Sequence, residues 1–290
     1  MKIAVIGASG KSGNLVVARL CDDDHKVTAI SRDPARLAGL DPRAQTATGD
    51  LTDVPAMTAV LATADRVINL AHARFTEDLL AALPRGSSVV LTGSVRKYTR
   101  LVDPAADDVR AGEAAFLGWL KGGGNGVMVH PSMIYGAAGD RNVGRILGVM
   151  GRWPRILPMV LPLPGGGRNT VQPVFADDFA DAVVAAATAT DLLPPTVDIV
   201  GPAPIRYSTL VGECARALGR RAFIIPVPVW ALVALAKIAG LVGLRLPFTG
   251  AEFARGTEDK QFDPAPMIQA LGVTPRTFAQ GVRDKIARES

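Results

Sequence analysis

The chain has 290 residues, of which 48% are hydrophobic and 20% are charged, a composition typical of a globular protein with a large buried core. Its net charge of +5 comes without any block of like charges, which argues against a nucleic-acid-binding protein. Cys21 and Cys214 lie far apart and the three histidines are scattered, so we expect no metal site. The low cysteine content and the apolar run after Met1-Lys2, too short for a signal peptide, predict a cytoplasmic protein.

The first predicted element is a buried strand at Ile3–Ile6, followed by Gly7-Ala8-Ser9-Gly10-Lys11-Ser12-Gly13 and a helix that includes Leu15–Leu20. A triphosphate-binding loop needs a glycine five residues before Gly10, where Val5 stands, so that interpretation fails. Glycines between a strand and a helix instead indicate a dinucleotide-binding turn, in which the helix N-terminus faces a pyrophosphate. The candidate cofactor residues in this turn are Gly7, Ser9, Gly10, Lys11, Ser12 and Gly13.

The second predicted strand, Val27–Ile30, ends in Ser31-Arg32-Asp33. The residue at this strand tip reads the adenosine ribose of a dinucleotide. A hydroxyl and a planar guanidinium suit a 2′-phosphate, so Ser31 and Arg32 predict NADP as the cofactor. Two alternatives stay open: Asp33 turns inward and favours NAD, or Arg32 only starts the next helix.

Strands and helices alternate through the rest of the first half, with strands at 45–48, 66–70, 88–92 and 127–130 and helices at 54–62, 76–83 and 104–120. This pattern predicts an α/β protein with a Rossmann-type, doubly wound parallel sheet, whose ligands bind at the carboxyl ends of the strands. Residues 1–140 would form this NAD(P)-binding domain. The further candidate cofactor residues at the strand ends are Asp50, Leu51, Leu70, Ala71, His72, Thr92, Gly93, Pro131, Ser132 and Met133.

Over nearly its whole length the sequence resembles the short-chain dehydrogenase/reductase superfamily, in its extended and atypical branches. Gly7–Gly13 matches the cofactor turn of that family, and Asp50-Leu51 matches the pair that holds the adenine. The segment from His130 to Gly136 is similar to the family's R-P-x-x-x-Y-G, with histidine in place of arginine, and Val174–Ala180 resembles its V-x-V-x-D-V-A. The resemblance implies an NAD(P)-dependent enzyme related to the epimerases and dehydratases.

The sequence departs from this family in its catalytic residues. Family members that transfer hydride use a Tyr and a Lys four residues apart, and the ammonium group lowers the pKa of the phenol. Glu113 resembles the glutamate that follows this pair, and counting back from it places Ala105 and Val109 at the tyrosine and lysine positions. No Tyr or Lys occurs between Leu101 and Leu120, so the standard dyad is absent.

Three other residues are candidates for the catalytic role. Ser94 follows the strand at 88–92, where the family places the hydroxyl that polarises the substrate. Tyr98, with Lys97 beside it, offers a substitute phenol and cation, and His72 offers an acid or base near the nicotinamide. A turn residue, a solvated lysine and a structural histidine are the alternative explanations for these side chains.

The second half, residues 141–290, is expected to be a mixed segment that contributes a smaller α/β substrate lobe, with 171–200 returning to the main sheet. Its part from Val197 to Gly272 resembles the small substrate lobe of nucleotide-sugar epimerases. A helix is expected at 142–153, and prolines exclude a central strand from the run 156–164. Val229–Leu244 is apolar on every face except at Lys237, but it is too short for a transmembrane span. We expect it to be buried or to contact a membrane surface or a protein partner.

The sequence therefore favours an NADP-dependent oxidoreductase that acts on a small molecule without the standard dyad. The alternatives are a non-catalytic NADP(H)-binding regulator or sensor, a structural protein associated with a larger complex, and a nucleotide-sugar epimerase or dehydratase. The oligomeric state is left open.

Overall fold

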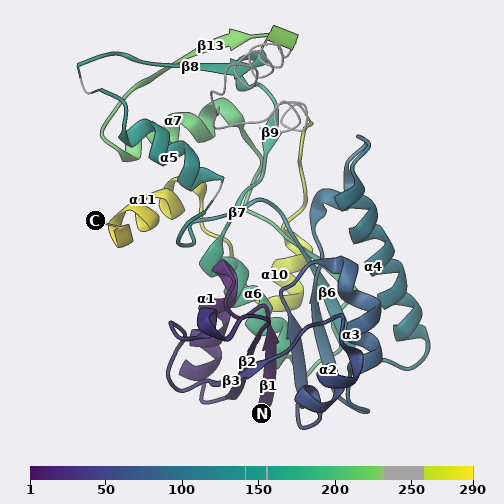
Figure 1. Cartoon of the computed structure of the whole chain (residues 1–290). Helices are drawn as coiled ribbons and strands as arrows, with labels where there is room; N and C mark the ends of the chain where they lie inside the picture. The colour runs from purple at the N-terminus through teal and green to yellow at the C-terminus, as the bar shows by residue number, and fades with distance from the viewer. Residues whose placement is uncertain (141, 155, 229, 232–257, 290) are drawn as a thin grey trace. The chain divides into compact units, whose positions relative to one another are not determined.

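The computed structural model describes residues 1–140, 142–154, 156–228, 230–231 and 258–289 (Figure 1). The chain forms two compact units. Unit 1 comprises Met1–Ser132, Ala176–Val200 and Pro264–Pro275, and unit 2 comprises Met133–Phe175, Gly201–Asp263 and Arg276–Ser290. The chain passes between the units five times, so neither unit is one continuous stretch of sequence.

Unit 1 is built on a seven-stranded, wholly parallel sheet in the order β11-β6-β5-β4-β1-β2-β3. The strands are β1 (Lys2–Ile6), β2 (Lys26–Ser31), β3 (Gln45–Thr48), β4 (Arg66–Asn69), β5 (Ser88–Thr92), β6 (Gly126–Pro131) and β11 (Thr196–Ile199). The central strands are rich in Val, Ile and Leu because helices bury them on both faces. The strand order reverses between β1 and β4, which is where a doubly wound sheet binds its ligand. The predicted fold class is thus confirmed.

Helices cover both faces of this sheet (Figure 1). The helices of unit 1 are α1 (Lys11–Asp22), α2 (Val54–Leu61), α3 (Thr76–Ala82), α4 (Pro104–Lys121), α6 (Ala176–Thr188) and α10 (Ala265–Leu271). Met57, Leu79 and Phe116, from α2, α3 and α4, bury their side chains against one face of the sheet. On α1, Arg19 forms ion pairs with Asp177 at 2.8 Å and with Asp181, which join α1 to α6.

Short 3₁₀ turns follow three of the strands at their carboxyl ends. They are η1 (Pro34–Leu37), η2 (Ala73–Phe75) and η3 (Val95–Tyr98). In each, the residue before the turn accepts a hydrogen bond from a backbone N–H two residues ahead: Asp33, His72 and Ser94. Polar side chains at this edge of the sheet therefore have a local structural role as well as any role toward a ligand.

Unit 2 has three two-stranded sheets and three helices among its described residues. The sheets pair β7 (Ile134–Tyr135) with β10 (Val174–Phe175), β9 (Thr170–Val171) with β12 (Ile205–Arg206), and β8 (Met159–Pro164) with β13 (Ala222–Val227). The helices are α5 (Val143–Gly151), α7 (Tyr207–Ala217) and α11 (Phe278–Glu289), and Gly165–Gly167 form the turn η4. Within the described part of the chain, the proline-rich β8 pairs on one edge, with β13, so its prolines disrupt no central ladder there.

The core of unit 2 contains Tyr135, which is fully buried. Its ring lies 5.3 Å from that of Phe175 and 4.9 Å from that of Phe278, and its hydroxyl donates to the Phe278 carbonyl. The tyrosine of the His130–Gly136 segment is therefore a packing residue.

Among the described residues, no helix combines the length and the apolar character needed to cross a membrane. The expected contact segment Val229–Leu244 lies outside the described residues apart from Trp230 and Ala231.

Candidate cofactor site and active site

The glycine turn after β1 has the geometry of a phosphate-binding loop. Gly7 has φ +77° and donates its N–H to the Ile30 carbonyl at 3.1 Å, while Gly10 donates to the Gly7 carbonyl at 2.9 Å. Gly10 precedes α1 and supplies no side-chain acceptor to the first N–H groups of that helix. Those donors, together with the helix dipole, fit a pyrophosphate, with Lys11 and Ser12 in the first turn.

Gly13 allows the turn to lie directly against the helix. A Cβ atom at this position would lie 2.6 Å from the Ala8 carbonyl oxygen and still closer to that of Gly7. Only glycine fits without moving the backbone, as a dinucleotide-binding turn requires. A Cβ at Gly10 would lie 3.0 Å from the Gly7 oxygen, so a side chain at either position would crowd the backbone of the turn.

At the tip of β2, the three residues Ser31-Arg32-Asp33 take different roles. The Ser31 hydroxyl lies 3.1 Å from that of Ser9, which joins the strand tip to the glycine turn. Arg32 is exposed. The Asp33 carboxylate accepts the Ala35 N–H at 3.0 Å and caps η1, so this structure assigns Asp33 to the cap and not to an inward position.

Asp50 follows β3 and is held by a local turn. Its Oδ1 atom accepts from the N–H and the hydroxyl of Thr52, at 3.0 and 2.9 Å. These two hydrogen bonds lower the pKa of the Asp50 carboxyl, and the positive charge of Arg32 adds to the effect. Leu51, next in the chain, is buried beneath this turn.

The end of β4 closes against the glycine turn. The Leu70 N–H donates to the Ile6 carbonyl at 3.0 Å, and the Ala71 N–H donates to the side chain of the buried Asn69 at 3.0 Å. His72 is exposed, and its Nδ1 atom accepts the Arg74 N–H at 3.3 Å. That bond makes His72 the cap of η2 and leaves its other ring nitrogen to carry the proton of the neutral form.

The end of β5 is organised around His130, which is fully buried in β6. Its Nδ1 atom accepts the Ser94 N–H at 3.1 Å, and the ring fills the space that a side chain at Gly93 would occupy. Burial, reinforced by the nearby Lys97 charge, lowers the pKa of His130 to about 3, so the ring is neutral and its proton lies on Nε2. The buried hydroxyl of Thr92, the residue before Gly93, has no hydrogen-bond partner among the described residues.

Lys97 and Glu113 form an ion pair next to this histidine. The Lys97 Nζ atom lies 2.7 Å from Glu113 Oε1, and the two side chains are only 9% and 17% exposed. The same carboxylate oxygen lies 3.6 Å from His130 Nε2. Glu113 thus faces the two donors, an ammonium and an imidazole N–H, at the carboxyl end of β5.

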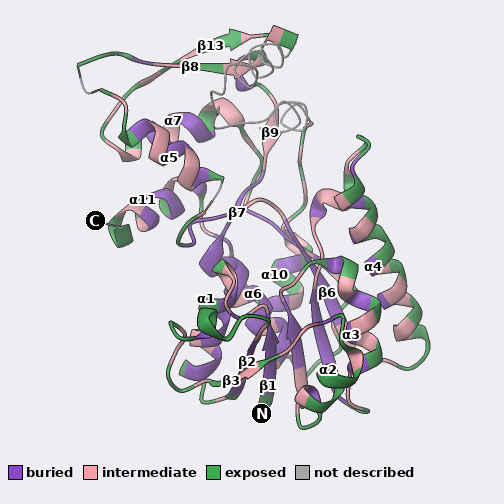
Figure 2. Ribbon diagram, viewed as in Figure 1, coloured by how far each residue is buried: buried purple, intermediate pink, exposed green. Residues whose placement is uncertain are grey.

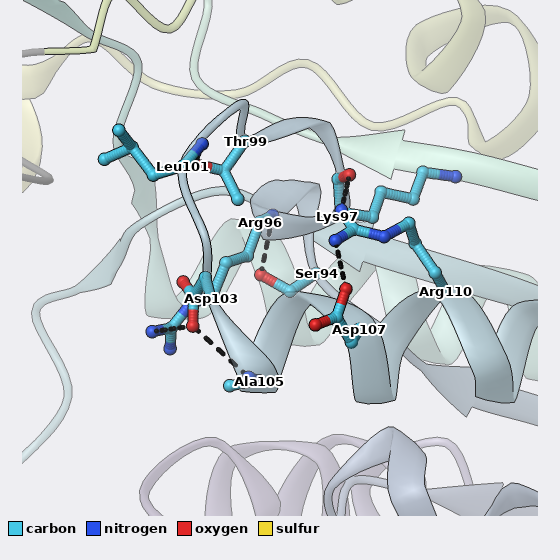
Figure 3. A network of polar contacts seen from close by, with 9 residues as sticks. All are labelled: Ser94, Arg96, Lys97, Thr99, Leu101, Asp103, Ala105, Asp107 and Arg110. Carbon is cyan, nitrogen blue, oxygen red and sulfur yellow. Dashed lines mark hydrogen bonds and ion pairs between the residues drawn. The ribbon is translucent and has the colours of Figure 1, made fainter.

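The loop that carries Ser94 and Lys97 is fixed by a second set of charged contacts (Figure 3). Arg96 pairs with the buried Asp103, which also accepts the Ala105 N–H at the start of α4. Arg110 donates to the Lys97 carbonyl at 2.6 Å. The Ser94 hydroxyl accepts the Arg96 N–H at 3.1 Å, so its own proton is directed away from that N–H.

Tyr98 differs from the tyrosine of the standard dyad in its electrostatics. Its hydroxyl donates to Asp198 Oδ2 at 3.1 Å, although Lys97 Nζ also lies 4.9 Å from the ring centre. Partial burial and the Asp198 charge raise the pKa of Tyr98 to about 12. Burial in turn raises the pKa of Asp198, on β11. The phenol is therefore protonated at neutral pH and acts as a donor.

Pro131, Ser132 and Met133 lie where the chain leaves the sheet. Ser132 donates its N–H to the Ile199 carbonyl at 2.9 Å and is the last residue of the first segment of unit 1. Met133 belongs to unit 2, where its carbonyl accepts the Val174 N–H at 3.1 Å. The structure therefore groups Pro131 and Ser132 with the other predicted residues in unit 1, whereas Met133 is held by contacts within unit 2.

Comparison with known proteins supports a nicotinamide cofactor. Residues 7–101 match the NAD(P)H-binding family. No curated protein sequence matches the chain significantly. The fold, however, is similar to solved structures over nearly their whole length. These neighbours include epimerase/dehydratase-type proteins, and the chain shares their Rossmann-like α/β fold.

Three solved structures illustrate this likeness. The crystal structure of gox2253 is 20% identical, with a TM-score of 0.74 over 98% of this chain and 96% of that one. UDP-glucuronic acid 4-epimerase from Bacillus cereus, in complex with UDP-glucuronic acid and NAD, is 16% identical, with a TM-score of 0.74 over 100% of both chains. UDP-glucose 4-epimerase from Thermotoga maritima, with UDP-glucose, is 14% identical, with a TM-score of 0.74 over 100% and 99%. At these identities the likeness establishes the fold.

Within this fold, the structure adds two residues that sequence reasoning did not assign to the site. Asp198 is the hydrogen-bond partner of Tyr98, and Asn69 holds the backbone after β4. Each is a polar residue at or near the carboxyl end of its strand, β11 or β4, and that signal is visible in the sequence. The role of each residue depends on its hydrogen-bond partner in the folded chain, and the sequence does not show that partner.

Proposed function

We propose that the protein is an NADP(H)-dependent oxidoreductase that reduces a small carbonyl compound without the standard Tyr-Lys dyad. The observation that carries the cofactor choice is the tip of β2. Arg32 is exposed there, while the one carboxylate that would disfavour a 2′-phosphate, that of Asp33, is used to cap η1. We place the enzyme in the cytoplasm, a location supported by its two free cysteines.

Different residues of unit 1 suit different parts of the cofactor. The N-terminus of α1, with Gly7, Gly10 and Gly13, suits the pyrophosphate. Ser31 and Arg32 suit the 2′-phosphate of the ribose, and Asp50-Leu51 the adenine. When bound, the nicotinamide supplies a hydride to the substrate or accepts one from it.

Two hydroxyl groups near the end of β5 are candidate proton donors for the reduction of a carbonyl. Reduction of a carbonyl needs a donor that polarises the oxygen and supplies a proton, and oxidation of an alcohol needs a base. The Ser94 hydroxyl has a proton to give, and the raised pKa of Tyr98 keeps the phenol protonated at neutral pH. Lys97 then stabilises negative charge that develops beside Tyr98.

One observation favours a second candidate, a cofactor-binding sensor. The raised pKa of Tyr98 is the opposite of the shift that the dyad lysine produces, and Val109, at the lysine position, is buried in α4. A sensor needs binding without turnover. The nucleotide-sugar epimerases among the structural neighbours give a third candidate, in which the cofactor is NAD.

The cofactor proposal is tested by calorimetric titration with NADPH, NADP, NADH and NAD, using the wild type, Arg32→Asp and the control Arg85→Asp. Arg85 is an exposed arginine in the loop before β5, at the opposite edge of the sheet. Loss of a charge-assisted hydrogen bond to phosphate is expected to weaken NADPH binding about 10- to 100-fold in Arg32→Asp and to leave NADH binding nearly unchanged. Equal losses for both nucleotides would refute the assignment of the 2′-phosphate to Arg32.

Turnover separates the enzyme from the sensor. The wild type, Ser94→Ala and Tyr98→Phe are mixed with NADPH and a panel of aldehydes and ketones, and oxidation of NADPH is followed by its absorbance. The enzyme proposal predicts turnover by the wild type. It also predicts that kcat falls at least about 100-fold in Ser94→Ala or in Tyr98→Phe, whichever of the two removes the proton donor. Tight NADPH binding without turnover on any carbonyl of the panel would favour the sensor.

A further inference from the structure

The two-stranded sheet β8–β13 of unit 2 has an apolar outer face. In this parallel pair Met159 lies opposite Ala222 and Val160 opposite Phe223, and successive residues alternate between the two faces. Met159, Leu161, Leu163 and Ala222 pack on the core of unit 2. The other face therefore carries Val160, Pro162 and Pro164 from β8 with Phe223, Ile225 and Val227 from β13.

This outer face is open to solvent. Phe223 is 59% exposed and Ile225 is 49% exposed, and Figure 2 shows exposed positions along β13. A sheet with one face in water normally alternates apolar and polar residues, and here both faces are apolar. A contiguous exposed apolar surface of this kind marks an interaction site.

Apolar residues also flank this sheet at the entry to β8 and after the end of β13. Ile156, which is 93% exposed, and Leu157 precede β8, and Trp230, which is 74% exposed, follows β13. Arg220 fixes the first of these segments, because its guanidinium donates to the carbonyls of Met150, Trp153 and Pro154. We call Ile156, Leu157, Trp230 and the outer residues of β8 and β13 the apolar ribbon.

The sequence around the apolar ribbon contains no acidic residue. Residues 141–176 and 214–251 hold ten arginines and lysines and no Asp or Glu. The whole chain has 32 basic and 27 acidic residues, so the remainder carries more acidic than basic side chains. The excess of basic residues thus falls in the two sequence segments that contain the residues of the ribbon, and of these basic residues Arg152 and Arg221 are described and exposed.

We propose that the apolar ribbon binds the surface of an anionic lipid bilayer. Apolar side chains with a tryptophan, together with exposed arginines such as Arg152 and Arg221, are the combination that inserts into the headgroup region and is held by negative lipid charge. A nucleic acid would meet apolar side chains that offer no hydrogen bonds. A second copy of the chain would bring two basic surfaces together, and like charges oppose that contact.

Vesicle flotation with the full chain tests this proposal, using phosphatidylcholine alone and phosphatidylcholine mixed with phosphatidylglycerol. We expect binding to the anionic vesicles and a fall in binding as salt is raised. The double variant Phe223→Thr/Ile225→Thr keeps residues that favour strands and is expected to bind the anionic vesicles at least about tenfold more weakly. Arg221→Ser should bind about fivefold more weakly.

The matched controls are Leu192→Thr, which removes an apolar side chain that is 95% exposed in unit 1, and Arg85→Ser. Both should bind vesicles like the wild type, and circular dichroism checks that every variant is folded. Equal binding of the double variant and the wild type, or equal binding to the two kinds of vesicle, would overturn the proposal. A wild-type dimer in light scattering that the double variant converts to a monomer would assign the ribbon to a second copy instead.

Discussion

Replacing Gly13 by alanine tests the cofactor turn most directly. The added Cβ would lie 2.6 Å from the Ala8 carbonyl oxygen and closer still to the Gly7 oxygen, and both are backbone atoms. An ordinary contact needs about 3.4 Å or more, so the turn must move by roughly 1 Å. Overpacking of this kind costs about 1–3 kcal/mol, and alanine regains up to about 1 kcal/mol through its higher helix propensity. The net expectation is a loss of about 1–2 kcal/mol in the free energy of unfolding.

The matched control is Gly118→Ala in α4, where an added Cβ meets no atom within 4 Å. Here only the helix propensity changes, and the variant should be more stable by about 1 kcal/mol. Both glycines lie in unit 1, so urea denaturation monitors the same unit for both variants. The two identical chemical changes should therefore shift the midpoint in opposite directions.

Cofactor binding gives a second measurement on these variants. A displacement of the turn moves the N–H donors at the start of α1, and loss of one charge-assisted hydrogen bond corresponds to about 10- to 100-fold weaker NADPH binding in Gly13→Ala. Gly118→Ala should bind NADPH like the wild type. If Gly13→Ala matched the wild type in both stability and NADPH affinity, the close approach of α1 to the turn would be wrong.

Two further predictions concern the polar groups at the end of β5. Glu113→Gln leaves the largely buried Lys97 ammonium without its counter-charge and should lower the free energy of unfolding by about 2–4 kcal/mol. The control is Glu77→Gln, at an exposed position on α3, which should change the free energy of unfolding by less than about 0.5 kcal/mol. The pKa of His130 is about 3 in the folded protein and near 6.5 when unfolded, so the unfolded chain binds the extra proton between these values and stability falls as the pH falls from 6.5 toward 3. His130→Asn should remove about 2 kcal/mol of the stability difference between pH 7 and pH 5, measured by urea denaturation at both pH values, and an unchanged pH profile would contradict the neutral, buried state of the ring.

Local sequence patterns were sufficient to predict strands and helices of unit 1. The predicted strand at 45–48 is β3, the one at 88–92 is β5, and the helix expected at 104–120 is α4 to within one residue. These elements follow from short-range causes, because apolar runs bounded by Gly, Pro, Asp or Asn specify buried strands and capped helices within a few residues. The glycine turn was predictable for the same reason, since its spacing, strand and helix are adjacent in the chain.

Long-range partners were not predictable. The pairing of Tyr98 with Asp198 joins residues 100 positions apart, and this contact, together with burial, keeps the phenol protonated. Likewise His130 takes its neutral state from burial in β6 and from Lys97, which a strand pattern cannot reveal. A pKa depends on the charges and the solvent within a few ångströms, and only the folded chain brings these together.

The sequence by itself thus determined the alternation of strands and helices, the position of the glycine turn and the lack of Tyr and Lys between Leu101 and Leu120, since each depends on residues close together in the chain. The tertiary structure decided that Asp33 caps η1, that Tyr135 is a core residue of unit 2 and that the outer face of β8 and β13 is apolar. Each of these depends on which side of an element faces the core, and that is set by the packing of segments distant in sequence.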